Sequence, residues 1–380
     1  MTDTSPDRPD VPDVPDVIVS GHICLDLILE FESDAFADLD LESGALVLIN
    51  QAKSSTGGVV ANTGLALHRL GVATSLMAKV GEDLFGQEIL RLLRAKDPQL
   101  VECMRIDPDA RTSFTAVVNP VGKDHTFLHL AGANDSFGAE DVSVERLSQA
   151  RLFHFGYPPI MKRIRQDGGH ELKTILQRVR EAGLTTSLDM CSVDPSSEAG
   201  RVDWRSYLGT VLPEVDLFVP SIDELLAMMS IPKGPITRAL LHQVSGQLLD
   251  MGAAIVLLKL GDQGLFLRTT PDPQRLETLG RALAQQATSE AWLGCEMGVP
   301  AFQANVVGTT GAGDSTIAGF IGALLKGYPP RDAITFAAAV GAFCVEQSDA
   351  ASGIPPWNDV TKRLQAGWPT LPGVLNGDSA

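Results

Sequence analysis

The order of apolar and polar positions divides most of the chain into short strands that alternate with helices. Apolar runs rich in β-branched residues, typical of buried strands, occupy residues 17–20, 74–80, 152–155, 186–189, 217–219 and 254–258. Apolar positions at helical spacing predict helices over residues 62–71, 85–93, 172–182, 223–229, 240–251 and 316–325. This alternation predicts an α/β fold, a doubly wound and mainly parallel sheet with helices on both faces and ligands at the carboxyl ends of the strands.

A second group of strand signals stands apart from this alternation. Residues 114–118 and 126–130 flank a turn at residues 119–122 and predict an antiparallel hairpin. Residues 45–49 have the same β character, whereas residues 22–26 are expected in a loop or at a sheet edge. We therefore expect a small sheet that stands off the main body, with strands drawn from residues 31–56 and 111–132.

Composition divides the chain into three parts. Residues 1–16 repeat Pro-Asp-Val with interleaved aspartates, and they hold too little apolar surface to fold, so we expect a disordered tail. Residues 17–360 are expected to form the folded domain and residues 361–380 a C-terminal tail. With 380 residues and 44% hydrophobic content, the chain can bury a large core.

Charge and cysteine usage exclude several classes of partner. The formal net charge of -17 disfavours both nucleic acid and an anionic membrane, which attract basic surfaces. No apolar run approaches the roughly 18 residues that a membrane-spanning helix needs. The five cysteines are widely spaced and form no CxxC pair, which indicates reduced thiols and a cytoplasmic protein.

The segment from residue 308 to residue 315 carries the clearest chemistry. It reads Gly-Thr-Thr-Gly-Ala-Gly-Asp-Ser and enters a helix, so its backbone N–H groups and the helix dipole predict an anion site at Gly311, Ala312 and Gly313. It fits the phosphate-loop pattern GxxxxGK[ST] except that Asp314 occupies the position of the lysine. A carboxylate there repels phosphates unless it faces the acceptor hydroxyl, so Asp314 is the candidate general base. The plain alternative is an aspartate that caps a helix.

A second glycine-rich segment lies near the N-terminus. Gly57 and Gly58 allow close approach of a ligand to the backbone, and Asn62 in the following helix offers a donor and an acceptor to a polyol. A loop that leads into a helix, with Asn62 near its N-terminus, is the alternative interpretation.

Taken together, Gly57-Gly58…Asn62 and the run from Thr309 to Asp314 resemble the two signatures of the ribokinase (PfkB) family of carbohydrate kinases. Their order and separation match as well, and the resemblance extends over about residues 17–357. It implies a ribokinase-like doubly wound sheet with a small β-sheet lid over the substrate. It also implies transfer of the γ-phosphoryl group of ATP, with Mg²⁺, to a hydroxyl of a sugar or sugar-like substrate.

Further site residues follow from the resemblance. Asp26, with Gly57, Gly58 and Asn62, is expected to bind the substrate; its alternative is a surface aspartate. The nucleotide side is expected to consist of Lys259, Gly261 and Gly264 in a KxGxxG hairpin, together with Thr309 and Thr310. Glu224, in a segment that resembles the family's PNxxE, is expected to act on Mg²⁺ through water.

The sequence also departs from the family pattern. Ser221 replaces the asparagine of PNxxE, Val59 stands at a lysine position of ribokinase, and Gly156 stands at the position of a sugar-binding glutamate. Ribose is therefore not the expected substrate. Gly308 replaces an aspartate that helps to ligate an activating potassium ion, which predicts weak dependence on a monovalent cation. Alternatively, carbonyl groups of residues 348–353 complete that site.

Three classes of function remain open after these observations. They are a sugar kinase, a nucleoside kinase of the same fold, and a sugar- or nucleotide-binding protein without turnover. Low aromatic content, 6%, favours a sugar over a nucleobase that needs a stacking wall, and the intact Asp314 favours turnover. A homodimer through the lid is possible in this family. No ligand pattern around His22 or His154 predicts a metal, and a structural role is favoured for His129. An insertion near residues 277–298 has no counterpart in the family pattern.

Overall fold

The computed structural model describes residues 15–30, 48–119 and 126–372. Its centre is an eight-stranded sheet of order β14-β13-β12-β11-β10-β9-β1-β4. The six strands from β12 to β4 are parallel, and β13 and β14 are antiparallel additions at one edge. The strands are β1 (Val17–Gly21), β4 (Thr74–Met77), β9 (Leu152–Gly156), β10 (Thr185–Leu188), β11 (Leu217–Phe218), β12 (Ile255–Lys259), β13 (Leu265–Thr269) and β14 (Glu296–Val299).

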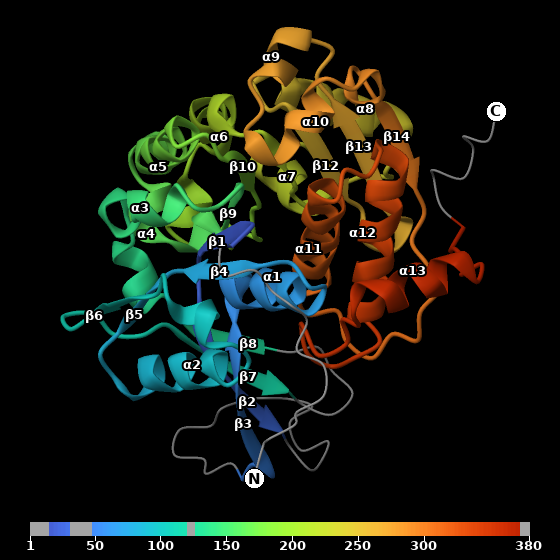
Figure 1. Cartoon of the computed structure of the whole chain (residues 1–380). Coiled ribbons are helices and arrows are strands. Elements are labelled where there is room, and N and C mark those ends of the chain that lie inside the picture. The colour runs from blue at the N-terminus through green and yellow to red at the C-terminus, as the bar shows by residue number, and fades with distance from the viewer. Residues whose placement is uncertain (1–14, 31–47, 120–125, 373–380) are drawn as a thin grey trace, which may run out of the picture.

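Helices cover both faces of this sheet (Figure 1). Successive side chains of a strand point to opposite faces, so Val17 and Val19 join one buried cluster and Ile18 joins the other. The first cluster includes side chains of α1 (Gly58–Arg69), α11 (Ala312–Leu325) and α12 (Pro330–Cys344). The second includes side chains of α5 (His170–Glu181), α6 (Trp204–Val211), α7 (Ile222–Met228) and α8 (Arg238–Asp250). The doubly wound α/β architecture is confirmed.

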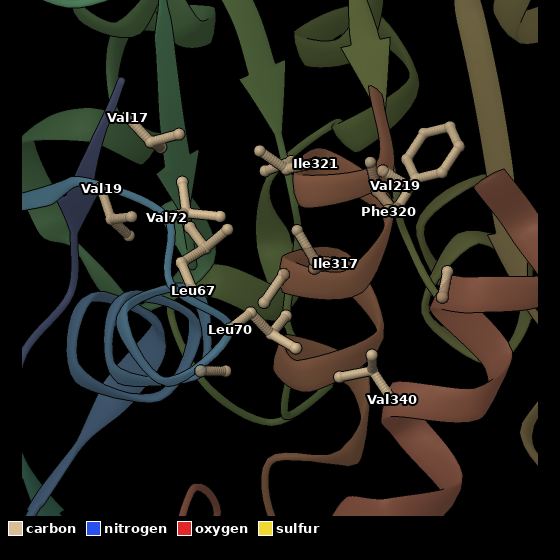
Figure 2. Packing of buried hydrophobic residues seen from close by; sticks show 14 of the residues in the cluster. Val17, Val19, Leu67, Leu70, Val72, Val219, Ile317, Phe320, Ile321 and Val340 are labelled. Carbon is tan, nitrogen blue, oxygen red and sulfur yellow. The ribbon is translucent and has the colours of Figure 1, made fainter. Parts of the chain in front are cut away.

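Helix α11 is buried along almost its whole length, since every residue from 314 to 324 is buried and most of them are small or apolar. Figure 2 shows Ile317 and Ile321 on the side of α11 that faces Leu67 and Leu70 of the α1 region. Gly319 allows α12 to approach, since a Cβ there would lie 2.9 Å from the side chain of Val340. This packing fixes the N-terminal turn of α11, which carries Asp314.

A four-stranded sheet of order β3-β2-β7-β8 lies beyond one end of the main body (Figure 1). Its strands are β2 (Cys24–Glu30), β3 (Gln51–Gly57), β7 (Phe114–Asn119) and β8 (Thr126–Leu130). We call it the lid sheet. The predicted hairpin of β7 and β8 is antiparallel, as expected.

Three predicted element boundaries were wrong. Residues 22–26 were expected in a loop or edge, but β2 begins at Cys24 and places Asp26 inside the lid sheet. A strand was expected at residues 45–49, but β3 begins at Gln51, and residues 48 and 49 precede it. Residues 45–47 lie outside the described residues. The strand expected at residues 74–80 is divided into β4 and β5 (Lys79–Gly81), because β5 leaves the large sheet to pair with β6 (Arg105–Asp107).

The insertion near residues 277–298 is packed against the body. Trp292 is 2% exposed, and Gln286 donates from Nε2 to the carbonyl of Leu324 in α11 at 2.8 Å. The segment ends in β14, which extends the large sheet. The segment therefore packs against α11.

The remaining α-helices are short or peripheral. They are α2 (Leu84–Arg94), α3 (Val144–Leu147), α4 (Lys162–Arg165), α9 (Pro273–Glu277), α10 (Ala284–Ala287) and α13 (Trp357–Gln365). The domain boundary expected at residue 360 falls inside α13, and Trp368 beyond it donates from Nε1 to the carbonyl of Gln303 at 2.6 Å. Among the described helices, none combines the length and the apolar character that crossing a bilayer requires.

Candidate active site

The candidate site lies where the parallel strands of the large sheet end. Tyr157 directly follows β9, Asp189 directly follows β10, and Lys259 is the last residue of β12. These three side chains line one cleft together with Glu224 of α7 and Asp314 of α11. Carboxyl ends of parallel strands form the usual ligand site of an open α/β sheet.

The glycine-rich turn forms the start of α11. Gly311 has a φ of 75°, and a Cβ on it would lie 2.2 Å from the Cβ of Ala350, so only glycine fits. The N–H of Ala312 donates back to the carbonyl of Thr309 at 3.2 Å. Gly313 and Asp314 follow in the first turn, where helix geometry provides no intrahelical acceptor for the N–H groups. The turn therefore presents N–H donors and a positive helix end to the cleft.

Asp314 is buried, with 2% of its surface exposed, and it accepts hydrogen bonds from two side chains. Asn62 donates from Nδ2 to Oδ2 at 2.9 Å, and the Tyr157 hydroxyl lies 3.1 Å from Oδ1 and 2.9 Å from Oδ2. Burial raises the pKa of Asp314, while the hydrogen bonds from Asn62 and Tyr157 and the charge of Lys259 oppose that rise. Asn62, predicted as a substrate ligand, thus contacts the predicted base directly.

Tyr157 was not predicted as a site residue. Its φ of 63° lies in the left-handed region, where a bulky side chain is strained by about 1–3 kcal/mol. Burial raises its pKa well above the ordinary range, and the nearby Asp314 and Asp189 carboxylates raise it further. The hydroxyl therefore remains a proton donor to Asp314. Its position directly after a strand was the available sequence signal.

Lys259 forms an ion pair with Asp189, whose Oδ1 lies 2.9 Å from Nζ. Both residues are buried, at 9% and 1% exposed. Burial lowers the pKa of Lys259, but the carboxylates of Asp189, Glu224 and Asp314 outweigh it, and the net pKa is raised. Lys259 therefore stays charged, and its Nζ lies 3.4 Å from the position of a Cβ on Gly313. Asp189 holds this cation beside the glycine turn. Like Tyr157, it was not predicted as a site residue from the sequence.

Glu224 lines the cleft from the first turn of α7. It forms a capping box with Ser221: Glu224 Oε2 accepts from the Ser221 N–H at 3.1 Å, and the Ser221 hydroxyl accepts from the Glu224 N–H at 3.4 Å. Ser221, the departure from PNxxE, thus retains the polar cap of the helix. The capping box fixes the carboxylate at the cleft.

Most of the other predicted nucleotide residues line the same cleft. Gly261, Gly264 and Thr309 line it. Gly264 has a φ of 97°, and a Cβ there would lie 2.0 Å from the carbonyl oxygen of Val299, so the turn requires glycine. Thr310 does not line the cleft; its carbonyl oxygen lies 3.6 Å from the thiol of Cys344.

The predicted substrate residues Asp26, Gly57 and Gly58 meet where the lid sheet joins α1. A Cβ on Gly57 would lie 2.1 Å from Asp26 Oδ2, and a Cβ on Gly58 would lie 2.5 Å from His22 Nδ1. The two glycines are therefore required by the side chains that press on them. Burial raises the pKa of Asp26, although hydrogen bonds from Cys24 and Thr115 oppose the rise.

Comparisons with known proteins bear on this arrangement. Residues 15–357 match the family described as "pfkB family carbohydrate kinase". A 2-dehydro-3-deoxygluconokinase of Bacillus subtilis is 25% identical over 86% of this chain and 91% of its own. A nucleoside kinase of Methanothermobacter thermautotrophicus is 24% identical over 94% of this chain and 98% of its own.

Solved structures agree on the fold. Arabidopsis thaliana ribokinase, solved with ribose and ATP, superposes with a TM-score of 0.71 at 21% identity, covering 93% of this chain and 99% of that chain. A putative ribokinase II of E. coli, solved with ATP and Mg²⁺, gives a TM-score of 0.67 at 20% identity, covering 93% of this chain and 100% of that chain.

These matches define a kinase of the ribokinase fold, a phosphotransferase with an alcohol group as acceptor. The chain belongs to the pfkB family of carbohydrate kinases. It is a sugar or nucleoside kinase, so the expected family, fold class and enzyme class are confirmed.

Proposed function

We propose that this protein transfers the γ-phosphoryl group of ATP to a hydroxyl of a sugar or sugar-like substrate, with Asp314 as the general base. One observation carries the proposal: a buried carboxylate lies in the first turn of α11, directly after the glycine turn, and is held by Asn62 and Tyr157. A base must lie within hydrogen-bond reach of the proton that it takes. The adjoining turn of Gly311, Ala312 and Gly313 is proposed to stabilise charge on the transferring group through its backbone N–H groups, and the N–H of Ala312 would have to leave the carbonyl of Thr309 to take part.

The nucleotide is proposed to bind along the cleft. Gly261, Gly264 and Thr309 line it, and Thr310 supports the turn from behind. Lys259 supplies a charged ammonium beside Gly313, so it is suited to the phosphates. Glu224 is proposed to hold Mg²⁺ through water, because its carboxylate lines the same cleft and oxygen is the ligand that Mg²⁺ prefers.

The acceptor is proposed to lie on the lid side of Asp314. Asp26 in β2 and Asn62 in α1 face this region, with Gly57 and Gly58 between them. Carboxylate and amide groups bind hydroxyls of a polyol. A nucleoside is the second candidate acceptor, favoured by the match to a nucleoside kinase over most of both chains.

An acceptor panel tests the proposal. Ketohexoses, aldopentoses, ketodeoxy acids and nucleosides are scored by ADP release with ATP and Mg²⁺, using the native chain and Asp314→Asn. We expect one sugar class to support turnover and Asp314→Asn to lower kcat by about a hundredfold or more, with ATP affinity retained. Near-normal turnover of Asp314→Asn refutes its role as base. Turnover confined to nucleosides establishes the second candidate.

A homodimer through the lid sheet and a cytoplasmic location are also proposed. Leu128 and Leu130 of β8 are 61% and 45% exposed, and β8 is an edge strand of the lid sheet. Exposed apolar side chains on an edge strand favour pairing with another chain. Light scattering after size exclusion measures the mass. The five free cysteines are consistent with a reducing compartment.

A further inference from the structure

His22, Cys24 and His129 gather where the lid sheet meets the main body. They come from three places along the chain, namely the connection after β1, the start of β2, and β8. One ligand atom of each lies within 4.8 Å of the others, and no other such group of histidine, cysteine and acidic side chains occurs in the described part of the chain. His22 and Cys24 are 2% and 3% exposed, so both side chains are fixed by their surroundings.

The distance between the two imidazoles matches a shared ion. His22 Nε2 and His129 Nε2 are 3.2 Å apart. Two nitrogen ligands of a tetrahedral zinc ion are separated by about 3.3 Å, because each Zn–N bond is about 2.0–2.1 Å long. Without an ion, the two rings share at most one hydrogen bond, and His22 Nδ1 has no hydrogen-bond partner.

Thr115 of β7 contacts two of the three residues, His129 and Cys24. Its Oγ1 lies 3.0 Å from His129 Nδ1 and 3.5 Å from Cys24 Sγ. An Nδ1–H group that donates to Thr115 leaves the Nε2 lone pair of His129 facing His22. Metal-binding histidines are commonly held in this way by a partner on the other ring nitrogen.

Asp26 lies beside this cluster but is not one of the three residues whose ligand atoms lie within 4.8 Å of one another. Its Oδ1 lies 3.3 Å from Cys24 Sγ, on the same strand two residues away. We propose that His22, Cys24 and His129 form a binding site for a divalent transition metal ion of the zinc type, and that the Asp26 carboxylate turns toward the ion to complete it. Two imidazoles, a thiolate and a carboxylate form a soft and borderline donor set that selects zinc over magnesium. The site is therefore distinct from the oxygen site proposed at Glu224.

Occupation of this site has a consequence that rests on the proposed function. Asp26 is proposed to bind the acceptor, and an ion would draw its carboxylate toward Cys24. The His22 ring also lies beside Tyr157, with ring centroids 6.1 Å apart, and Tyr157 bonds to Asp314. Zinc is therefore expected to compete with the acceptor and to leave nucleotide binding unchanged.

Cobalt spectroscopy tests metal binding without any need for turnover. Chelator-treated full-length protein is titrated with Co²⁺, whose bond to a thiolate produces a charge-transfer band in the near ultraviolet. We expect saturation at one equivalent and displacement of Co²⁺ by Zn²⁺. Cys24→Ser should abolish the band, whereas the control Cys295→Ser, at a cysteine just before β14, should retain it. No band in the native protein, or an unchanged band in Cys24→Ser, overturns the site.

A second variant tests the site independently, in case Cys24→Ser does not fold. His129 is an exposed residue of β8, so His129→Gln removes a ligand without disturbing the core. We expect an unchanged melting temperature and at least about tenfold weaker Zn²⁺ binding by calorimetry, the scale on which perturbed metal shells lose affinity. Equal affinity refutes the site. If Zn²⁺ binds as expected but leaves the KM of the acceptor unchanged, the competition is refuted and the metal site stands.

Discussion

Gly156 at the end of β9 lies directly against Val59 in the first turn of α1. A Cβ on Gly156 would lie 2.4 Å from Val59 Cγ2 and 2.7 Å from Cγ1, and Val59 is fully buried. These are the two positions at which the resemblance to the family places the lysine and the glutamate of ribokinase. The two positions are therefore coupled in the structure, because the small residue at 156 makes room for the buried apolar side chain of Val59.

A double-mutant cycle measures this coupling. Gly156→Ala alone should lower the free energy of unfolding by about 1–3 kcal/mol through overpacking, and Val59→Ala alone should lower it by leaving a cavity. In the double variant the methyl group fills part of that cavity, so the loss should be at least about 0.5 kcal/mol smaller than the sum. Urea unfolding gives all three values. Gly209→Ala is the control second site, because no atom lies within 4 Å of a Cβ there; additivity of Val59→Ala with Gly156→Ala would contradict the coupling.

Tyr157→Phe should move the acid limb of kcat to higher pH. The hydroxyl donates to the Asp314 carboxylate and lowers its pKa, so removing it leaves the charged form less stabilised and raises that pKa. A base with a higher pKa is protonated, and inactive, at a higher pH. One hydrogen bond to a charged group corresponds to roughly one pH unit. The measurement is the pH profile of kcat, and Tyr328→Phe is a control away from the cleft. If the acid limb stays at the same pH in Tyr157→Phe, Tyr157 does not lower the pKa of the base.

Much of the fold followed from sequence because its signals are local. Alternating apolar runs and helical spacing predicted β1, β9, β10, β12 and the helices around them to within a few residues. Strand β2 was missed although Cys24–Glu30 is mostly apolar, because its conformation is determined by pairing with β3 and β7. Such pairing is nonlocal and leaves no mark in a short window of sequence.

Within the site, residues in segments that resemble the family pattern could be proposed from sequence, whereas Tyr157 and Asp189 could not. Asp314 and Asn62 lie in such segments, whereas Tyr157 and Asp189 are isolated after strands. Their contacts span 157 and 70 residues of chain, to Asp314 and Lys259. The same holds for His22 and His129, which are 107 residues apart. Only the folded topology brings these pairs together.

Lys259→Met should weaken ATP binding by at least about tenfold and retain acceptor binding. The ammonium lies beside Gly313 at the cleft, so its loss removes a charge from the phosphate region. It also leaves Asp189 buried without its partner, which destabilises the fold by about 3–5 kcal/mol. Calorimetry with ATP and with the acceptor separates the two half-sites. Lys233→Met, at a lysine that is 75% exposed, is the control; unchanged ATP affinity in Lys259→Met would remove Lys259 from the nucleotide site.

Turnover is expected to depend only weakly on the monovalent cation. Gly308 stands where the resemblance places a potassium-binding aspartate, and a Cβ on it would lie 3.1 Å from the carbonyl oxygen of Gln347 and 3.2 Å from Ser348 Cα. A side chain at position 308 would therefore pack tightly against the backbone of residues 347 and 348. Loss of a charged ligand weakens a cation site markedly.

The rival expectation places carbonyl oxygens of residues 348–353 around the ion. The carbonyl of Ala350 accepts from the Ser315 hydroxyl at 3.2 Å and from the Cys344 thiol at 3.4 Å, so protein donors compete with an ion for this oxygen. Assays in sodium, potassium, caesium and tetramethylammonium at constant ionic strength distinguish the two cases. Rates that agree within about twofold support a turn held by protein contacts alone, because a site that binds no ion selects none. A several-fold activation specific to potassium would instead mean that backbone carbonyls suffice to build the site.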